Sequence, residues 1–194
     1  MSNRIFVGDL EVKVSDVEGD IDNSPKNPDN YAVSAHWLII EDGVMSPVTH
    51  LVWNHNDKSV PDGRQSLQDA LDSCSKAIFH NAKFDASWLL DMEFEVPAVE
   101  CTMIREFLFA QARPWLLSLK ATAERRDVTR KKSDLVDELF KSGVGFEAIP
   151  LDTVLEYAEA DVISCAEIYL QQEEELNSPE YEEMKPIFQL MQDK

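Results

Sequence analysis

The chain has 194 residues, a length that suits one well-packed domain and is short for two. Hydrophobic residues make up 44% of it, which excludes a disordered chain, and no apolar run approaches the roughly 18–20 residues of a membrane span. The formal net charge of −19 repels anions at long range, so any site for nucleic acid must be local or rely on bound cations or a basic partner.

The first part of the chain predicts strands. Residues 4–12 form a short apolar run interrupted by acids, which is typical of a strand. Residues 15–30 carry two prolines, one glycine and many Asp or Asn side chains, so they predict a loop. Residues 31–40 and 47–55 are rich in β-branched and aromatic side chains, with a turn predicted at 41–43. These three consecutive strands predict an antiparallel meander.

Strand–helix units and then helices follow. Residues 66–75 predict a helix, 76–80 a buried strand and 83–91 the helix after it. Most of 100–140 has a helical pattern, and a long amphipathic helix is predicted from 151 to about 176. The apolar stripe of this last helix consists of Leu155, Ala158, Val162, Cys165 and Tyr169. This order of elements predicts a mixed α/β domain without internal repeats.

Basic residues are concentrated in one segment, where the helical pattern is interrupted near 113–114 and around 127–132. Eight of the eighteen lie within 105–132, beside three acids. They are Arg105, Arg113, Lys120, Arg125, Arg126, Arg130, Lys131 and Lys132. Two interpretations stay open: a solvated helical face with a mixed-charge loop, or a strip that contacts phosphates.

The three cysteines and the N-terminus indicate a reducing compartment. Cys74, Cys101 and Cys165 are odd in number and widely spaced, without a CxxC pair, which favours free thiols over a disulfide framework or a thiolate zinc site. Residues 1–12 lack the basic segment and long apolar stretch of a signal peptide. We expect a cytoplasmic protein without membrane association.

The first candidate site is Asp9-Leu10-Glu11. Residues two apart on a strand project to the same face, so Asp9 and Glu11 are expected side by side, with Ile5 and Val7 further back. Two adjacent carboxylates repel each other and raise one pKa unless a cation lies between them. In so acidic a chain an Asp-x-Glu motif also arises by chance, so it is weak alone.

The second candidate is the segment FHNAKFD at 79–85. An apolar strand ends here and a helix begins, which is a position where α/β domains place ligand-binding residues. Structural alternatives stay open. Asn81 can be a helix cap, and Asp85 can be a first-turn acid favoured by the helix dipole.

The third candidate pairs Tyr157 with Asp161 on the long helix. A separation of four residues puts both on one helical face, one turn apart. The alternative is a core aromatic beside a surface acid. However, Asp161 directly precedes the apolar residues 162–163, next to the stripe, where an unpaired charge is costly.

Together the three segments resemble the DEDD exonuclease superfamily, in the subgroup whose third motif uses tyrosine. The second motif, FHNAKFDASWL, resembles the proofreading domains of A-family DNA polymerases, including those of bacteriophages. Residues 100–104, 118–126 and 149–161 resemble further segments of that family, and the resemblance covers roughly 3–172. It implies a ribonuclease H-like mixed sheet with strands one to three antiparallel, flanked by helices. A phage-encoded relative would act in the host cytoplasm.

The resemblance also implies an activity: 3′–5′ removal of single nucleotides from single-stranded DNA as 5′-mononucleotides. Asp9, Glu11, Asp85 and Asp161 would bind two divalent cations, Mg²⁺ or Mn²⁺, which all-oxygen ligation favours. Tyr157 would orient the attacking water, because a phenol with a reference pKa near 10 is a poor base at neutral pH. The substrate-binding residues implied are Asn81 and Phe84 at the single-stranded end, and Lys120 and Arg125 at the backbone.

Counting supports the tyrosine subgroup, and two departures stand out. The histidine subgroup places His five residues before the last Asp, where this chain has Glu156. Residues 12–14 are Val-Lys-Val where many relatives have Thr-Thr-Gly or Thr-x-Gly, and a Thr there helps to hold the terminal nucleotide. Glu100 and Cys101 replace the usual aromatic-Asp pair before Thr102. Neither change removes an expected metal ligand.

The sequence leaves alternatives open for the substrate and for the partners. An exoribonuclease would use identical motif chemistry, since contacts to the 2′-hydroxyl are not readable here, and a non-catalytic interaction module could keep the fold. We expect a separately encoded subunit or an excised domain that acts in proofreading or DNA processing, with a DNA polymerase or other replication protein supplying basic surface. Residues 1–172 would be the exonuclease domain. Residues 173–194 would be an acidic tail that covers the domain's own core or docks to a partner through the apolar residues 186–191.

Overall fold

The computed structural model describes residues 3–17, 20–57, 63–111, 113–129 and 134–192. The strands are β1 Arg4–Lys13, β2 Ser15–Val17, β3 Asp20–Asp22, β4 Tyr31–Glu41, β5 Val44–Met45, β6 Thr49–Val52, β7 Lys76–Phe79 and β8 Ala98–Cys101. The helices are α1 Arg64–Asp72, α2 Ala82–Asp91, α3 Thr102–Ala110, α4 Leu119–Arg126, α5 Asp134–Lys141, α6 Leu151–Leu176, the 3₁₀ helix η2 Pro179–Met184 and α7 Lys185–Gln192.

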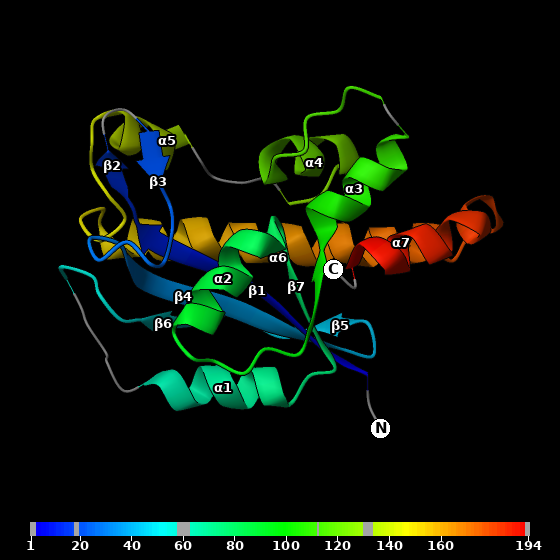
Figure 1. Cartoon of the computed structure of the whole chain (residues 1–194), viewed down its shortest axis with the longest axis horizontal. Helices are drawn as coiled ribbons and strands as arrows, with labels where there is room; N and C mark the ends of the chain where they lie inside the picture. Colours follow the sequence, from blue (N-terminus) through cyan, green and yellow to red (C-terminus); the bar gives the residue numbers. More distant parts are fainter. Residues whose placement is uncertain (1–2, 18–19, 58–62, 112, 130–133, 193–194) are drawn as a thin grey trace.

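A mixed sheet organises the domain (Figure 1). Its strand order is β5-β4-β1-β7-β8, and β6 pairs with β4 beside β5. The pairs β1–β4 and β4–β6 are antiparallel, whereas β7 joins β1 in parallel and β8 joins β7 in parallel. The predicted meander of three antiparallel strands is therefore confirmed, and it occupies one side of the sheet.

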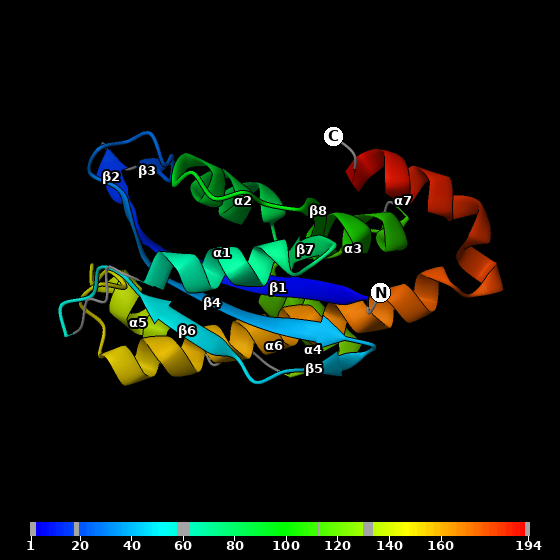
Figure 2. The same ribbon diagram turned by 90° about the horizontal axis from the view of Figure 1, so that it is seen from below.

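Alternation along β1 divides the core into two layers. Phe6, Leu10 and Val12 face the layer that α1 and α2 cover. Ile5 and Val7 face the opposite layer, which is covered by α6. Figure 2 shows α2 and α6 on opposite sides of the sheet. A side chain at Gly8 would collide with the rings of Phe6 and Phe79, which explains the glycine in this strand.

The register of β1 against β4 changes immediately after Glu11. Glu11 lies opposite Ser34 and Val12 lies opposite Ala32, so Val33 is the extra residue of a bulge. Val33 consequently points toward α6, where it is fully buried with Tyr157. The bulge thus bends the sheet at the end of β1 that carries the two predicted acids.

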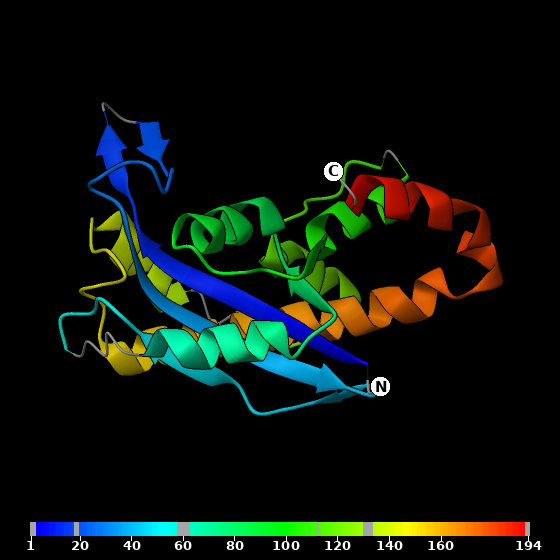
Figure 3. The same cartoon turned by 60° about the horizontal axis from the view of Figure 1, so that its bottom comes forward.

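The structure corrects two details of the prediction. Within the segment 15–30, which we expected to be a loop, β2 and β3 form a hairpin that projects from the main sheet (Figure 3). In the segment 100–140, which we expected to be mostly helical, the start belongs to the parallel edge strand β8. The long helix α6 ends at Leu176, as predicted, and among its stripe residues Leu155 is the half-buried one.

The C-terminal segment folds back onto the domain. Phe188 of α7 is buried, with its ring 5.0 Å from that of Phe109 on α3, and Tyr181 packs edge-on against the same ring. The predicted boundary between 1–172 and 173–194 falls within α6 and stays a prediction. In the part of the chain that the structure describes, no helix is both long and apolar enough to cross a membrane.

Candidate active site

Strand β1 directs Asp9 and Glu11 toward α6. Ile5 and Val7 pack against Val162 and neighbouring residues of that helix, and side chains two apart continue the same row. Asp9 and Glu11 therefore follow Ile5 and Val7 on this face. Glu11 is only 4% exposed, so its carboxylate lies inside the domain instead of on a solvated strand end.

The second motif brings Asp85 to the same strand. Asp85 lies in the first turn of α2, is 2% exposed, and accepts a hydrogen bond of 3.1 Å from the backbone N–H of Leu10. Burial raises the pKa of Asp85 well above its usual value, and the nearby negative charge of Asp9 raises it further. Asp85 is therefore not a solvated first-turn acid but a buried carboxyl group beside Asp9.

Helix α6 runs antiparallel to β1, and this direction aligns the third motif with the first. Near its start, Tyr157 packs with Val33 at the Glu11 end of β1. Further along, Cys165 packs with the row of Ile5 and Val7. Asp161 lies between these two levels of the helix and is 3% exposed. The alternative of a surface acid is therefore wrong for Asp161.

The pKa of the Cys165 thiol depends on the same carboxylates. Burial raises its pKa well above the usual value, and the negative charges of Asp9 and Asp85 add to the effect. Cys165 stands one helical turn after Asp161. Side chains from β1, α2 and α6 thus converge on one region of the α6 face.

Tyr157 is held by aromatic packing. Its ring centroid lies 5.8 Å from that of Phe146, which in turn packs edge-on against Phe140 at 4.5 Å. The side chain is 7% exposed. The hydroxyl of a buried tyrosine can form hydrogen bonds although its ring is apolar. Tyr157 precedes Asp161 by one helical turn.

The oxygen-only donor set of Asp9, Glu11, Asp85 and Asp161 fits a hard divalent cation such as Mg²⁺ or Mn²⁺. Burial, and then the negative charge of Asp9, raise the pKa of Asp85, and a bound cation would offset both effects. Within the described residues, no three His, Cys, Asp or Glu side chains are already arranged to hold a metal ion. The complete four-carboxylate cage stays a prediction.

A histidine pair that the sequence did not reveal lies beside this region. His36 on β4 stands opposite Asp9 in the register, and His50 on β6 stands opposite His36. The two Nδ1 atoms are 2.8 Å apart, and His36 Nε2 is 2.8 Å from the hydroxyl of Ser34. Burial, together with His50, lowers the pKa of His36 to about 3, so His36 is neutral at physiological pH. Only the strand register could have identified this pair.

The predicted substrate-binding residues Asn81 and Phe84 lie at the start of α2. Asn81 has a left-handed backbone (φ 65°), and its side chain makes no capping hydrogen bond to the helix. Asn81 therefore occupies the N-cap position of α2 without capping the helix through its side chain. Both residues line a cleft of about 360 Å³ together with Lys83 and the loop 23–25.

The other two predicted contacts occupy α4. Lys120 is exposed in the first turn of this helix. The guanidinium of Arg125 donates to Glu106 at 3.0 Å and to the carbonyl of Leu116 at 3.1 Å, and it stacks on Trp115. Arg125 therefore has a structural role in this state, and its predicted contact with nucleic acid stays a prediction.

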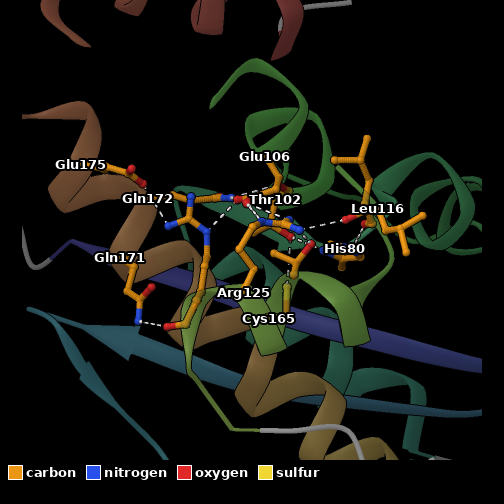
Figure 4. A network of polar contacts seen from close by, with 12 residues as sticks. His80, Thr102, Glu106, Leu116, Arg125, Cys165, Gln171, Gln172 and Glu175 are labelled. Carbon is orange, nitrogen blue, oxygen red and sulfur yellow. Dashed lines mark hydrogen bonds and ion pairs between the residues drawn. The ribbon is translucent and has the colours of Figure 1, made fainter. Parts of the chain in front are cut away.

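Part of the basic strip, Arg125 and Arg126, belongs to a buried ion network around Glu106 (Figure 4). Arg126 donates to Glu106 at 2.6 Å, and Gln172 of α6 donates to the same carboxylate at 3.0 Å. Arg105 is buried between Glu100 and Glu173. Arg105, Arg125 and Arg126 thus form ion pairs inside the domain, whereas Lys120 is exposed. Arg130, Lys131 and Lys132 lie outside the described residues.

The same network reaches the second motif through His80 (Figure 4). His80 Nε2 donates to the carbonyl of Leu117 at 2.8 Å, and its Nδ1 is 2.8 Å from the hydroxyl of Thr102. That hydroxyl also lies 3.8 Å from the sulfur of Cys165. His80 follows β7 and thus connects the end of that strand with α3 and with the segment that precedes α4.

Comparison with solved structures supports the fold. A structure described as the apo form of a nuclease has a TM-score of 0.65 and 17% sequence identity, covering 97% of this chain and 81% of that one. NrnC of Brucella melitensis with bound Mg²⁺ has a TM-score of 0.61 and 19% identity, covering 97% and 82%. These likenesses show the expected ribonuclease H-like α/β fold. No curated protein is significantly similar in sequence.

A family model described as 3′–5′ exonuclease matches residues 54–177, which is more than half of the chain. The matched range includes Asp85, Tyr157 and Asp161, and it begins after Asp9 and Glu11. The chain therefore belongs to this family of 3′–5′ exonucleases.

Proposed function

We propose that the protein removes nucleotides one at a time from the 3′ end of single-stranded DNA and releases 5′-mononucleotides. The observation that carries this proposal is the buried Asp85 carboxyl group, attached to β1 by the Leu10 N–H and placed beside Asp9. A buried carboxyl group whose pKa is raised by burial and by a neighbouring acid lowers stability, and such groups are typical of catalytic sites.

Each carboxylate has a distinct support. Asp9 and Glu11 project from a strand paired on both sides, Asp85 from the first turn of α2, and Asp161 from the middle of α6. Two divalent cations held by these four residues would supply the water activation and the stabilisation of the departing 3′ oxygen. Rigid elements on three sides would keep the carboxylate oxygens in place.

Tyr157 would orient the attacking water through its hydroxyl. Its ring packs in a buried cluster with Val33 and Phe146, which fixes the position of the phenol oxygen. A hydrogen bond from a fixed phenol favours one position of the water. This is the tyrosine-type arrangement that the sequence resemblance implies.

The 3′-terminal nucleoside would occupy a cleft of about 300 Å³ lined by the residues that follow Glu11 in the chain. Its apolar walls come from Val12, Val14, Phe140 and Val144. Phe140 is partly exposed and offers a ring for base stacking. Apolar packing would then replace the threonine contact that many relatives have after the first motif.

Degradation of a 3′-labelled DNA oligonucleotide with Mg²⁺ tests the proposal. Release of labelled 5′-mononucleotide is expected, and Asp9→Ala and Asp161→Ala should each abolish it. The exposed Asp152, at the start of α6, provides a matched Asp→Ala control that should retain full activity. Full activity of both site variants would remove the mechanism. An inactive wild-type chain would favour a non-catalytic module.

An RNA oligonucleotide of the same sequence decides the sugar preference. The motifs act on the phosphodiester, which DNA and RNA share, so the four carboxylates do not discriminate. We expect faster hydrolysis of DNA. Faster hydrolysis of RNA would assign the chain as an exoribonuclease with the same mechanism.

A polymerase or other replication protein is the partner that we propose. The chain carries 37 acidic and 18 basic residues, and several of the latter are used in internal ion pairs. Long-range attraction of a nucleic acid therefore has to come from elsewhere. Measurement of oligonucleotide hydrolysis with and without a candidate polymerase, at physiological salt, tests whether the partner increases the rate.

A further inference from the structure

Two polar residues of β4 lie directly opposite the two acids of β1. On the face of the sheet that α6 covers, the first two opposite pairs are apolar, namely Ile5 with Ile40 and Val7 with Leu38. The next two pairs are polar, because Asp9 stands opposite His36 and Glu11 opposite Ser34. Side chains directly opposite in an antiparallel pair have Cβ atoms roughly 4.5–5.5 Å apart. His36 and Ser34 are therefore the cross-strand neighbours of two predicted metal ligands.

The ring of His36 is held at both of its nitrogens. Strand β4 lies between β1 and β6 (Figure 2), so His36 has Asp9 on one side and His50 on the other. Its Nδ1 is 2.8 Å from Nδ1 of His50, and its Nε2 is 2.8 Å from the hydroxyl of Ser34. His36 is 1% exposed, and Ser34 is fully buried. Because water does not replace a lost hydrogen bond at this depth, the ring has one favourable orientation.

His36 carries no positive charge beside Asp9. A contact between two Nδ1 atoms requires that one of them be an unprotonated acceptor. Burial, and then the charge of His50, lower the pKa of His36 to about 3. Burial also lowers the pKa of His50, against the opposing effect of Glu159 on α6. The imidazole opposite Asp9 is therefore neutral at physiological pH.

The buried Glu106 shows what a charged neighbour does. Glu106 is 1% exposed and forms ion pairs with Arg125 and Arg126, whose positive charges offset its own. A guanidinium or ammonium group at position 36 would compete in the same way with a divalent cation for Asp9. A neutral ring fills the space beside the carboxylate and does not compete.

We propose that His36 is a positioning residue for the metal-binding acids of β1: its ring, held by His50 and Ser34, keeps the carboxylates of Asp9 and Glu11 in the orientation that divalent cations need. Residues packed around metal ligands fix the orientation of those ligands, and their loss typically weakens metal binding about 10- to 100-fold. The inference rests on the exonuclease function proposed above. It adds His36, Ser34 and His50 to a site whose sequence motifs contain none of them.

The affinity of the protein for Mn²⁺ in the absence of substrate tests the proposal. Electron paramagnetic resonance distinguishes free from bound Mn²⁺, so it measures the dissociation constant independently of catalysis. His36→Leu removes both hydrogen bonds of the ring and should raise this constant about 10- to 100-fold. His36→Gln, whose amide can reach Ser34, should stay within about threefold of wild type. His50→Ala removes one support of the ring and should raise the constant about fivefold.

Ile40→Ala is the matched control for an effect on stability alone. Ile40 is buried on the same strand and the same face, four residues from His36. Its truncation should lower the melting temperature and leave the affinity for Mn²⁺ unchanged.

Wild-type affinity for Mn²⁺ in His36→Leu would overturn the inference, and so would an equal loss in His36→Gln or in Ile40→Ala. Should His36→Leu not fold, the half-buried His50 carries the test, and an unchanged affinity in His50→Ala would overturn the inference. Failure of the exonuclease function itself has a different signature, since the wild-type protein would then neither bind Mn²⁺ at these carboxylates nor hydrolyse DNA.

Discussion

Among single residues, Asp85 combines burial with a neighbouring negative charge. A carboxyl group with a raised folded pKa binds its proton more tightly in the folded state. The metal-free protein therefore loses stability as pH rises from the unfolded value near 3.9 toward the raised folded pKa, and the loss persists above it. A cation bound at the proposed site would offset this loss of stability.

We predict that Asp85→Asn raises the melting temperature of the metal-free protein at pH 7, because it removes the charge and keeps an oxygen for the Leu10 N–H. The difference should vanish near pH 4, where the carboxyl group is protonated. Thermal unfolding in the presence of a chelator measures both. An unchanged or lower melting temperature at pH 7 would mean that neither burial nor Asp9 destabilises the charged Asp85 carboxylate in the folded state. Asp152→Asn, at an exposed acid, is the control.

Tyr157 permits a separation of chemistry from packing. Tyr157→Phe removes the hydroxyl and keeps the ring against Val33 and Phe146, so we expect a fall in kcat of roughly 10²-fold with little change in stability. Single-turnover hydrolysis and thermal unfolding of the same preparation measure the two effects. Wild-type kcat in this variant would exclude Tyr157 from orienting the water.

At the scale of elements, local patterns predicted most of the fold. The strands at 4–13 and 31–41 are apolar runs, the helix at 151–176 has helical periodicity, and each was predicted within a residue or two. Hairpin β2–β3 was missed because its strands have three residues each and pair only with one another. Strand β8 was missed because its conformation depends on parallel pairing with β7, which is not local in sequence.

The site was predictable to the extent that its motifs are local. Asp9 with Glu11, and Tyr157 with Asp161, follow from strand and helix spacing. The attachment of Asp85 to Leu10 bridges 75 residues, so no local pattern contains it. The same holds for the His36–His50 pair and for Arg125, whose place in the Glu106 network depends on helices that meet only in the folded chain.

The C-terminal element offers a stability test. Phe188→Ala should lower the free energy of unfolding by about 3 kcal/mol, because the side chain is buried against Phe109. Ile187→Ala, at an exposed position of the same helix, should stay within about 0.5 kcal/mol of wild type. Urea unfolding measures both. Equal small effects would favour the alternative that α7 is a docking segment and not cover for the core.

At the scale of the whole molecule, the net negative charge governs how a nucleic acid can approach. A net charge of −19 opposes the approach of a polyanion, and binding is then limited to local contacts. We predict that the isolated chain binds a single-stranded oligonucleotide more weakly than about 10⁻⁶ M at physiological salt. Fluorescence anisotropy measures this affinity. Nanomolar binding would contradict both the electrostatic argument and the need for a basic partner.

The proposed mechanism requires that acids from three distant segments of the chain hold two ions in one place. Anomalous diffraction from a crystal soaked in Mn²⁺ measures this directly. We predict two peaks roughly 3.5–4 Å apart, enclosed by Asp9, Glu11, Asp85 and Asp161. Peaks located elsewhere, or the absence of any peak at these carboxylates in a crystal that is saturated with Mn²⁺, would contradict the proposed mechanism.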